Sequence, residues 1–212
     1  MAALQLDDLT VRASPSGARF HVTAAADRGE VVGVAVPSRP VGRAFARTIA
    51  GLTPPVAGRI VTGDRDVTAV APPARRIGYV PAGGGLLPHL SIVDNITYRY
   101  RLDPAEQIRG LVDDEVVELT TQLELVSVQS RLPHAVTPDQ RLRAAIARAV
   151  LRYPPTALVV DLPEADALAL REHAVFTQVR LPSGDALAVV VCTDDAVLQS
   201  NLDRCAPATA LA

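Results

Sequence analysis

The sequence predicts an α/β protein with a mostly parallel core sheet, an N-terminal antiparallel β part and an inserted helical subdomain. Apolar runs of strand length at residues 31–36, 157–160 and 186–192 alternate with stretches of helical periodicity, which is typical of a parallel sheet covered by helices. Residues 4–24 contain two strand-like runs around a Ser-Pro-Ser-Gly turn, which indicates an antiparallel hairpin. Residues 91–153 have helical periodicity over most of their length, so we expect a helical block there.

Turn residues divide the rest of the chain into short elements. We expect strands at residues 4–11, 20–24, 31–36, 58–61, 65–67, 75–80, 157–160 and 186–192. We expect helices at residues 45–52, 91–102, 104–125, 137–153, 164–180 and 194–204, with a loop at residues 37–43. The core is therefore expected to be one discontinuous domain of residues 1–90 and 154–212, with residues 91–153 as the helical subdomain.

The composition excludes several classes of function. The chain has 212 residues, a formal charge of −2 and 21 basic residues, all of them arginine. Without lysine there is no Schiff-base nucleophile and no phosphate-loop lysine, and the charge balance excludes a strongly basic surface for nucleic acid. Cys192 and Cys205 do not have metal-ligand spacing. No apolar run reaches membrane-spanning length, so we expect any work at a membrane to depend on a partner.

Short framework segments follow one another in a characteristic order and spacing. They are Arg47–Leu52, Gly58–Ile60, Asp66–Thr68, Arg75–Val80, Leu87–Ile92, Asn95–Ile96, Arg131–His134, Gln140–Arg141, Ala145–Ala149, and Asp161 with Pro163. Together these segments resemble the nucleotide-binding domain of ABC transporters, the ATP-hydrolysing cassettes that power membrane transport. The resemblance implies a P-loop NTPase-like ABC ATPase fold. It also implies a dimer in which each ATP lies between one subunit's phosphate loop and the other subunit's signature motif.

The resemblance places a phosphate-binding loop of pattern G-x-x-G-x-G-K-[ST]-[ST] at residues 36–44. These residues are Val36, Pro37, Ser38, Arg39, Pro40, Val41, Gly42, Arg43 and Ala44. The three glycine positions, the lysine position and both hydroxyl positions therefore carry other residues. Glycines let such a loop point successive N–H groups at phosphate oxygens, whereas valine is strained in that conformation and proline has no N–H. Arg43 is next to the lysine position, but adjacent helical residues point about 100° apart, so we do not expect it to replace the lysine.

Other chemical positions that the resemblance implies are also changed. The glutamine position holds Ala82, the catalytic glutamate position holds Leu162, and the switch histidine position holds Asp194. Leucine cannot polarise water, and an aspartate would repel a γ-phosphate. The metal-binding aspartate is present as Asp161, which could hold a metal ion or simply cap the turn that follows its strand.

The signature motif L-S-G-G-Q appears as Val-Thr-Pro-Asp-Gln. Its last four positions are Thr137, Pro138, Asp139 and Gln140. We expect Thr137 and Gln140 to form a capping box at the start of a helix, with the Asp139 carboxylate where a phosphate would dock. The aromatic residue that stacks on adenine in the family is replaced by Arg12 or Ala13.

These observations favour a catalytically inactive ABC-type subunit that acts as a scaffold or regulator in a transporter complex. We expect no cofactor, since ATP and magnesium would bind only if a partner compensated the changes in a slow ATPase, which is the first alternative. The second alternative is a soluble regulatory protein that reuses the fold. The expected partners are transmembrane subunits docking near Ala82–Asn95, and a second ABC ATPase subunit or another copy of this chain, but no nucleic acid. The expected location is cytoplasmic, at the inner face of the cell membrane through those partners.

Overall fold

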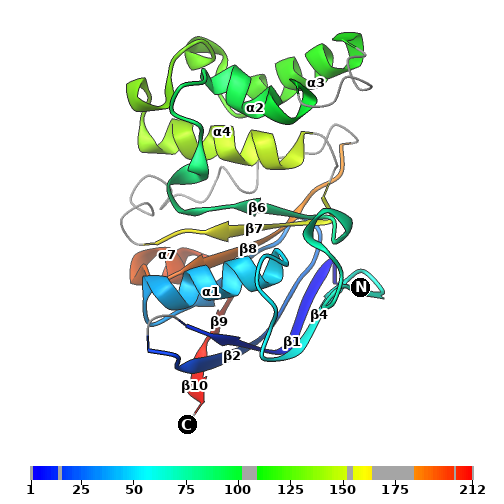
Figure 1. Ribbon diagram of the computed structural model, residues 1–212, viewed down its shortest axis with the longest axis vertical. Coiled ribbons are helices and arrows are strands. Elements are labelled where there is room, and N and C mark those ends of the chain that lie inside the picture. The colour runs from blue at the N-terminus through cyan, green and yellow to red at the C-terminus, as the bar shows by residue number, and fades with distance from the viewer. Residues whose placement is uncertain are drawn as a thin grey trace.

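A computed structural model describes residues 2–13, 16–101, 109–151, 155–163, 184–202 and 204–211. The described residues form two five-stranded sheets and a layer of helices (Figure 1). The helical layer covers one face of the parallel sheet, and helix α1 and the antiparallel sheet lie on its other side. The predicted α/β fold, with parallel and antiparallel parts and helices around them, is confirmed.

The parallel sheet has the strand order β6-β7-β8-β3-β9. Its strands are β3 (Val31–Ala35), β6 (Ile77–Val80), β7 (Ala157–Asp161), β8 (Ala188–Thr193) and β9 (Arg204–Pro207). All residues of β7 and β8 are buried, because both faces of this sheet are covered. This explains why these strands have continuous apolar runs in the sequence.

The antiparallel sheet has the strand order β10-β2-β1-β4-β5. Its strands are β1 (Leu4–Arg12), β2 (Arg19–Ala26), β4 (Ala57–Thr62), β5 (Arg65–Asp66) and β10 (Thr209–Leu211). The strands β1 and β2 form the predicted hairpin, with a register irregularity between Leu6 and Leu9.

The helices have the following bounds. They are α1 (Arg39–Ile49), α2 (Ile92–Arg101), α3 (Arg109–Gln122), α4 (Pro138–Val150) and α7 (Ala196–Asn201), with short 3₁₀ turns η1 (Pro72–Ala74), η2 (Ala82–Gly85), η4 (Val126–Val128) and η5 (Pro133–Ala135). Helices α2, α3 and α4 make up the helical layer, in which α4 contacts β6 and α2 packs on α4. The helix expected at residues 164–180 lies outside the described residues.

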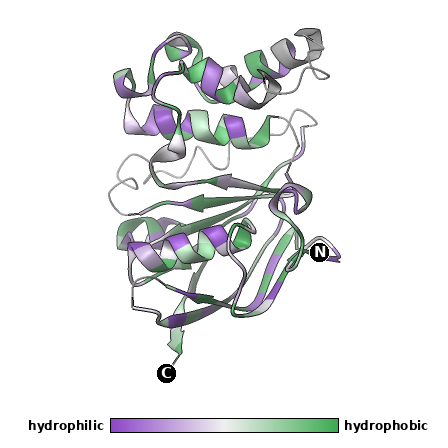
Figure 2. Cartoon of the chain, in the orientation of Figure 1, coloured by the Kyte–Doolittle hydropathy of each residue, from purple (hydrophilic) through white to green (hydrophobic). Residues whose placement is uncertain are grey.

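Alternating side chains of the parallel sheet divide the apolar core in two. Leu158 and Val160 of β7 join the cluster beneath the helical layer. Ala157 and Val159 join the cluster that contains α1 and the antiparallel sheet. Bands of purple and green alternate along α1 in Figure 2, as expected for a helix with one face in this second cluster.

Helix α1 begins earlier than the sequence predicted. The prediction of a loop at residues 37–43 is wrong, because only residues 36–38 connect β3 to α1. Pro40 lies in the first turn of the helix, where its fixed φ suits the helix and its missing N–H is not needed. The N–H groups of Val41 and Gly42 both donate to the carbonyl of Ser38, at 3.1 Å each, so the first turn is closed.

A buried arginine fixes the other end of α1. The helix ends at Ile49, and Gly51 follows with a left-handed φ of 82°. A Cβ at residue 51 would collide with the Arg75 side chain, so glycine is needed there. The Arg75 guanidinium donates to the carbonyls of Thr48, Ile49, Thr68 and Val70 at 3.0, 3.1, 2.7 and 2.7 Å. Arg75 therefore joins the C-terminus of α1 to the segment before β6.

The C-terminal segment also differs from the prediction. The helix expected at residues 194–204 is only α7, and β9 begins at Arg204. Strand β9 pairs with β3 in the parallel sheet, and β10 pairs with β2 in the antiparallel sheet. The bidentate pair between Arg204 and Glu30 fixes the start of β9.

Candidate functional site

The candidate site lies at the edge of the parallel sheet where β3, β7 and β8 end, which is where ligands bind in such sheets. The N–H of Val36, directly after β3, donates to the carbonyl of Thr193 at 3.0 Å. The N–H of Leu162, directly after β7, donates to the carbonyl of Cys192, also at 3.0 Å. The structure therefore brings the ends of β3, β7 and β8 together at this edge.

Gly42, at the lysine position of the phosphate-loop pattern, lies close to Asp161. A Cβ atom at residue 42 would lie 3.2 Å from Cγ2 of Val36, 3.7 Å from the carbonyl oxygen of Cys192 and 3.9 Å from Oδ1 of Asp161. Asp161 is only 2% exposed. Any longer side chain at residue 42 would therefore start between an apolar side chain and a buried carboxylate.

Arg43 provides positive charge beside the same carboxylate. Its Nε lies 3.8 Å from Oδ2 of Asp161, and its side chain is 54% exposed. Magnesium requires several oxygen ligands, but here a guanidinium adjoins the carboxylate and Ala44 has no hydroxyl. Among the described residues, no three His, Cys, Asp or Glu side chains are placed to hold a metal ion. The carboxylate of Asp161 is therefore accompanied here by a guanidinium, and neither residue 43 nor residue 44 supplies a hydroxyl.

The charge of Asp161 affects two groups nearby, the half-buried Tyr79 and the buried Cys192. Burial raises the pKa of the Tyr79 phenol, and Asp161 raises it further, against the opposing effect of Arg47 and Arg43. Burial also raises the pKa of the Cys192 thiol, again with a contribution from Asp161. The buried carboxylate of Asp161 therefore makes the inner side of the site acidic, and the exposed guanidinium of Arg43 makes its outer side basic.

Leu162, at the catalytic glutamate position, is part of the apolar core. It is 1% exposed and belongs to the cluster beneath the helical layer. With Gly83, Gly84, Pro138, Arg141 and Leu142 it lines a void of only about 20 Å³. The structure thus brings residue 162, the start of the signature helix and the glycines after Ala82 into close packing.

The signature segment forms the predicted capping box. The N–H of Gln140 donates to Oγ1 of Thr137 at 3.2 Å, and the N–H of Thr137 donates to Oε1 of Gln140 at 3.0 Å. The sequence did not reveal that Asp139 is paired: Nε of Arg143 donates to its Oδ2 at 2.8 Å. Because Arg143 also contacts Glu124 at 3.1 Å, its charge is shared between two carboxylates. This pairing reduces the repulsion that Asp139 would exert on a phosphate.

The segment at Ala82 is folded against the signature helix. Arg148 of α4 donates from Nη1 to the carbonyl of Gly85 at 2.9 Å, and from Nη2 to that of Gly84 at 2.8 Å. Gly84 has a φ of 77°, and a Cβ there would lie 3.1 Å from the carbonyl oxygen of Arg141. The sequence analysis missed the role of Arg148, because the contact joins residues 63 or 64 positions apart.

Asp194, at the switch histidine position, is half-buried and precedes α7. The next residue, Asp195, was not singled out in the sequence, yet it is the N-cap of this helix. Its Oδ1 accepts from the N–H of Leu198 at 2.6 Å, and its own N–H donates to Oγ1 of Thr193 at 3.1 Å. An aspartate just before a helical run is a usual cap, which is the signal that could have revealed it.

Comparison with known proteins agrees with this geometry. Residues 44–164, more than half of the chain, match the family model described as ABC transporter. The sulfate/thiosulfate import ATP-binding protein CysA of Mycobacterium tuberculosis is 34% identical over 163 residues, which cover 76% of this chain and 45% of that protein. CysA of Xylella fastidiosa is 33% identical over 138 residues, covering 64% and 39%.

A third relative is PhnT of Salmonella typhimurium, provisionally named a 2-aminoethylphosphonate import ATP-binding protein. It is 33% identical over 135 residues, which cover 64% of this chain and 36% of PhnT. The chain therefore spans less than half the length of these relatives. The family match includes strands β4 to β7 and the helical layer, but it starts at residue 44, the last position of the phosphate-loop pattern, and ends before β8 and β9. On this match the chain belongs to the ABC transporter family.

Proposed function

We propose that this chain is a catalytically inactive ABC-type subunit, a pseudo-ATPase that serves an ABC transporter as a scaffold or regulator. The start of α1 at Arg39, where the family has a phosphate-binding loop, carries the proposal. A phosphate loop holds a triphosphate by pointing free backbone N–H groups at it. Here the N–H groups of Val36, Val41 and Gly42 donate within the protein, and Pro40 has none.

The residues at the family's metal-binding and catalytic-base positions support the same proposal. The positive charge of Arg43 lies beside Asp161, where the family would need a metal ion. The residue at the glutamate position, Leu162, is buried in the core and has no group that could accept a proton from water. Loss of one oriented donor or base slows an enzyme by about a hundredfold or more, and several are absent here.

A transmembrane subunit is the partner we propose, because the relatives are import ATP-binding proteins. None of the described helices is long and apolar enough to cross a membrane. In the proposed complex, the transmembrane subunit would hold the chain at the inner membrane face. A groove of about 240 Å³ lies between the sheet and the helical layer, and Ile96, which directly follows the segment Ala82–Asn95, is one of its lining residues. Its lining residues offer apolar surface, including Leu52, Tyr79 and Ile96, together with two cations, Arg76 and Arg148. A cytoplasmic segment of the transmembrane subunit would dock there.

The test compares the purified chain with the Asp161→Asn variant, alone and together with its transmembrane subunit. Phosphate release and equilibrium binding of ATP would be measured at saturating magnesium. We expect phosphate release to be the same for the two proteins, at the background level. We also expect that the chain does not bind ATP with micromolar affinity. Hydrolysis that disappears in the Asp161→Asn variant would refute the proposal and support a slow or partner-complemented ATPase. Recovery of the native protein from cells without any membrane subunit would instead favour a soluble regulator.

A further inference from the structure

A stripe of positive charge runs along the exposed side of α1. Arg39, Arg43 and Arg47 are spaced four residues apart, so they lie on one face of the helix. All three are exposed, and the helix contains no acidic residue. Like charges at this spacing repel one another, so the stripe is unfavourable without a counter-charge.

Part of this stripe borders a groove. Arg43 and Arg47, together with Arg12 at the end of β1, line a groove of about 260 Å³. One side of the groove is apolar and includes Pro54 and Val56. No carboxylate is among its described lining residues. We call it the arginine groove.

The positive charges of the arginine groove are poorly compensated within the protein. In the part of the chain that the structure describes, no carboxylate pairs with Arg12 or Arg47 within 4.0 Å. The contact of Arg43 with Asp161 is long, at 3.8 Å. The chain as a whole has a net charge of −2, so this concentration of positive charge is local.

We propose that the arginine groove binds a small organic oxyanion, a phosphate ester or a molecule of the same chemistry. Guanidinium groups match the oxygens of phosphate in paired hydrogen bonds, and three of them surround this groove. The apolar side would contact the carbon part of the ligand. The volume lies just below the range of about 300–1,000 Å³ for drug-sized ligands, which indicates a ligand smaller than a nucleoside triphosphate.

This mode of binding differs from that of a phosphate loop. The ligand would be held by side-chain cations from β1 and α1, so it needs neither free backbone N–H groups nor a metal ion. The inference therefore does not depend on whether the chain hydrolyses ATP. It gives a subunit without an ATPase cycle a means of responding to a small anion.

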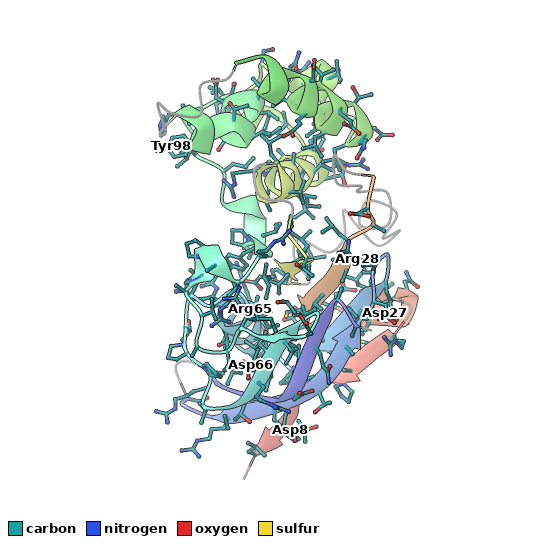
Figure 3. The ribbon with its side chains drawn as sticks, turned by 90° about the vertical axis from the view of Figure 1, so that its right-hand side faces the viewer. Asp8, Asp27, Arg28, Arg65, Asp66 and Tyr98 are labelled. Atoms are coloured by element: carbon teal, nitrogen blue, oxygen red, sulfur yellow. The ribbon has the colours of Figure 1, made fainter. Side chains whose placement is uncertain are left out.

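The test is calorimetric titration of the whole chain at constant ionic strength, with glycerol 2-phosphate, inorganic pyrophosphate and ATP as probes. The informative variants are Arg12→Gln and Arg47→Gln, which change exposed side chains. Arg65→Gln is the matched control, because Arg65 is exposed on β5 and does not line the groove (Figure 3). Thermal unfolding of each variant checks that its fold is intact.

We expect saturable binding of glycerol 2-phosphate and pyrophosphate. Each groove variant should bind about ten- to a hundredfold more weakly, which is the loss expected for a hydrogen-bonded charge. The control should stay within about twofold of the parent chain, because it removes a charge without removing a ligand contact. An absence of saturable binding, or an equal weakening in Arg65→Gln, would overturn the inference. Tighter binding of ATP than of pyrophosphate, lost in Arg47→Gln, would overturn the small-anion assignment. ATP turnover that requires Asp161 would refute the proposed function but leave this inference standing.

Discussion

Restoring a carboxylate at the catalytic position should destabilise the protein rather than activate it. The Leu162→Glu variant tests this, since glutamate is the residue that the family resemblance implies there. Leu162 is 1% exposed and lies in the apolar cluster that joins the sheet to the helical layer. The void beside it holds about 20 Å³, which is room for about one water molecule. A glutamate in this position would be enclosed with little hydration.

Two effects set the size of the loss. Removing a fully buried leucine side chain from the core costs about 1.5–3 kcal/mol. Burial would raise the pKa of the new carboxyl by about 2–4 units; each unit costs about 1.4 kcal/mol until the raised pKa reaches the ambient pH, so the cost at pH 7 is about 3–4 kcal/mol. Arg141 lines the same void, but its guanidinium already donates to the carbonyls of Val136 and Pro133, at 2.9 and 3.4 Å. We therefore expect Leu162→Glu to lower the free energy of unfolding at pH 7 by about 4–7 kcal/mol, much of the usual total.

The assay is urea unfolding followed by circular dichroism, at several pH values. Leu162→Met is the volume-matched control and should cost less than about 1.5 kcal/mol. Since the folded-state pKa of the new carboxyl is raised, its charge penalty should shrink as the pH falls through that value, and Leu162→Gln should lack this dependence. A loss below about 1 kcal/mol that does not change with pH would refute the reasoning, because it would mean that the side chain at residue 162 faces water.

Three further outcomes follow from the structure. Arg75→Met should lower the free energy of unfolding by about 3–5 kcal/mol, measured against Arg65→Met, because four carbonyls lose a buried charged donor; a loss equal to the control would contradict this role. The hydrogen bond from Arg204 holds the pKa of Glu30 below its ordinary 4.5, so this pair should stabilise the fold above that pH and lose its effect as the pH falls through the lowered value. Glu30→Gln should therefore differ from the parent in urea unfolding at pH 7 and converge with it in acid, and a constant difference would contradict the pairing. A thiol reagent should modify Cys205 but not Cys192 in the folded protein, and both after unfolding, since Cys205 is exposed whereas Cys192 is buried; modification of both in the folded state would contradict this.

Local sequence patterns predicted much of the fold because their causes are local. The apolar runs of β7 and β8 reflect burial on both faces of one strand, and the Thr137–Gln140 box reflects hydrogen bonds within one helical turn. The family resemblance located the site because framework segments kept their order. None of these predictions required contacts between distant parts of the chain.

The features that the sequence did not predict depend on distant contacts or on competition between conformations. Strands β9 and β10 have little pattern of their own, and they form because β3 and β2 offer them unpaired edges. The roles of Arg75 and Arg148 require carbonyls that are far away in the sequence. The segment at residues 37–43 was predicted as a loop from its glycine, proline and serine residues. Pro40 and the residues after it are also compatible with the first turn of a helix, and that is the conformation they adopt.

The pairing of β3 has a consequence for synthesis of the chain. Its two neighbours in the sheet are β8 and β9, which begin at Ala188 and Arg204, whereas β3 ends at Ala35. At about 5–20 residues per second, a ribosome needs roughly 10–30 seconds to make the stretch between β3 and β8. During that time both edges of an apolar strand lack their partners and can pair with other chains. Folding of this chain in the cell should therefore depend on chaperones that cover β3 until the last strands emerge.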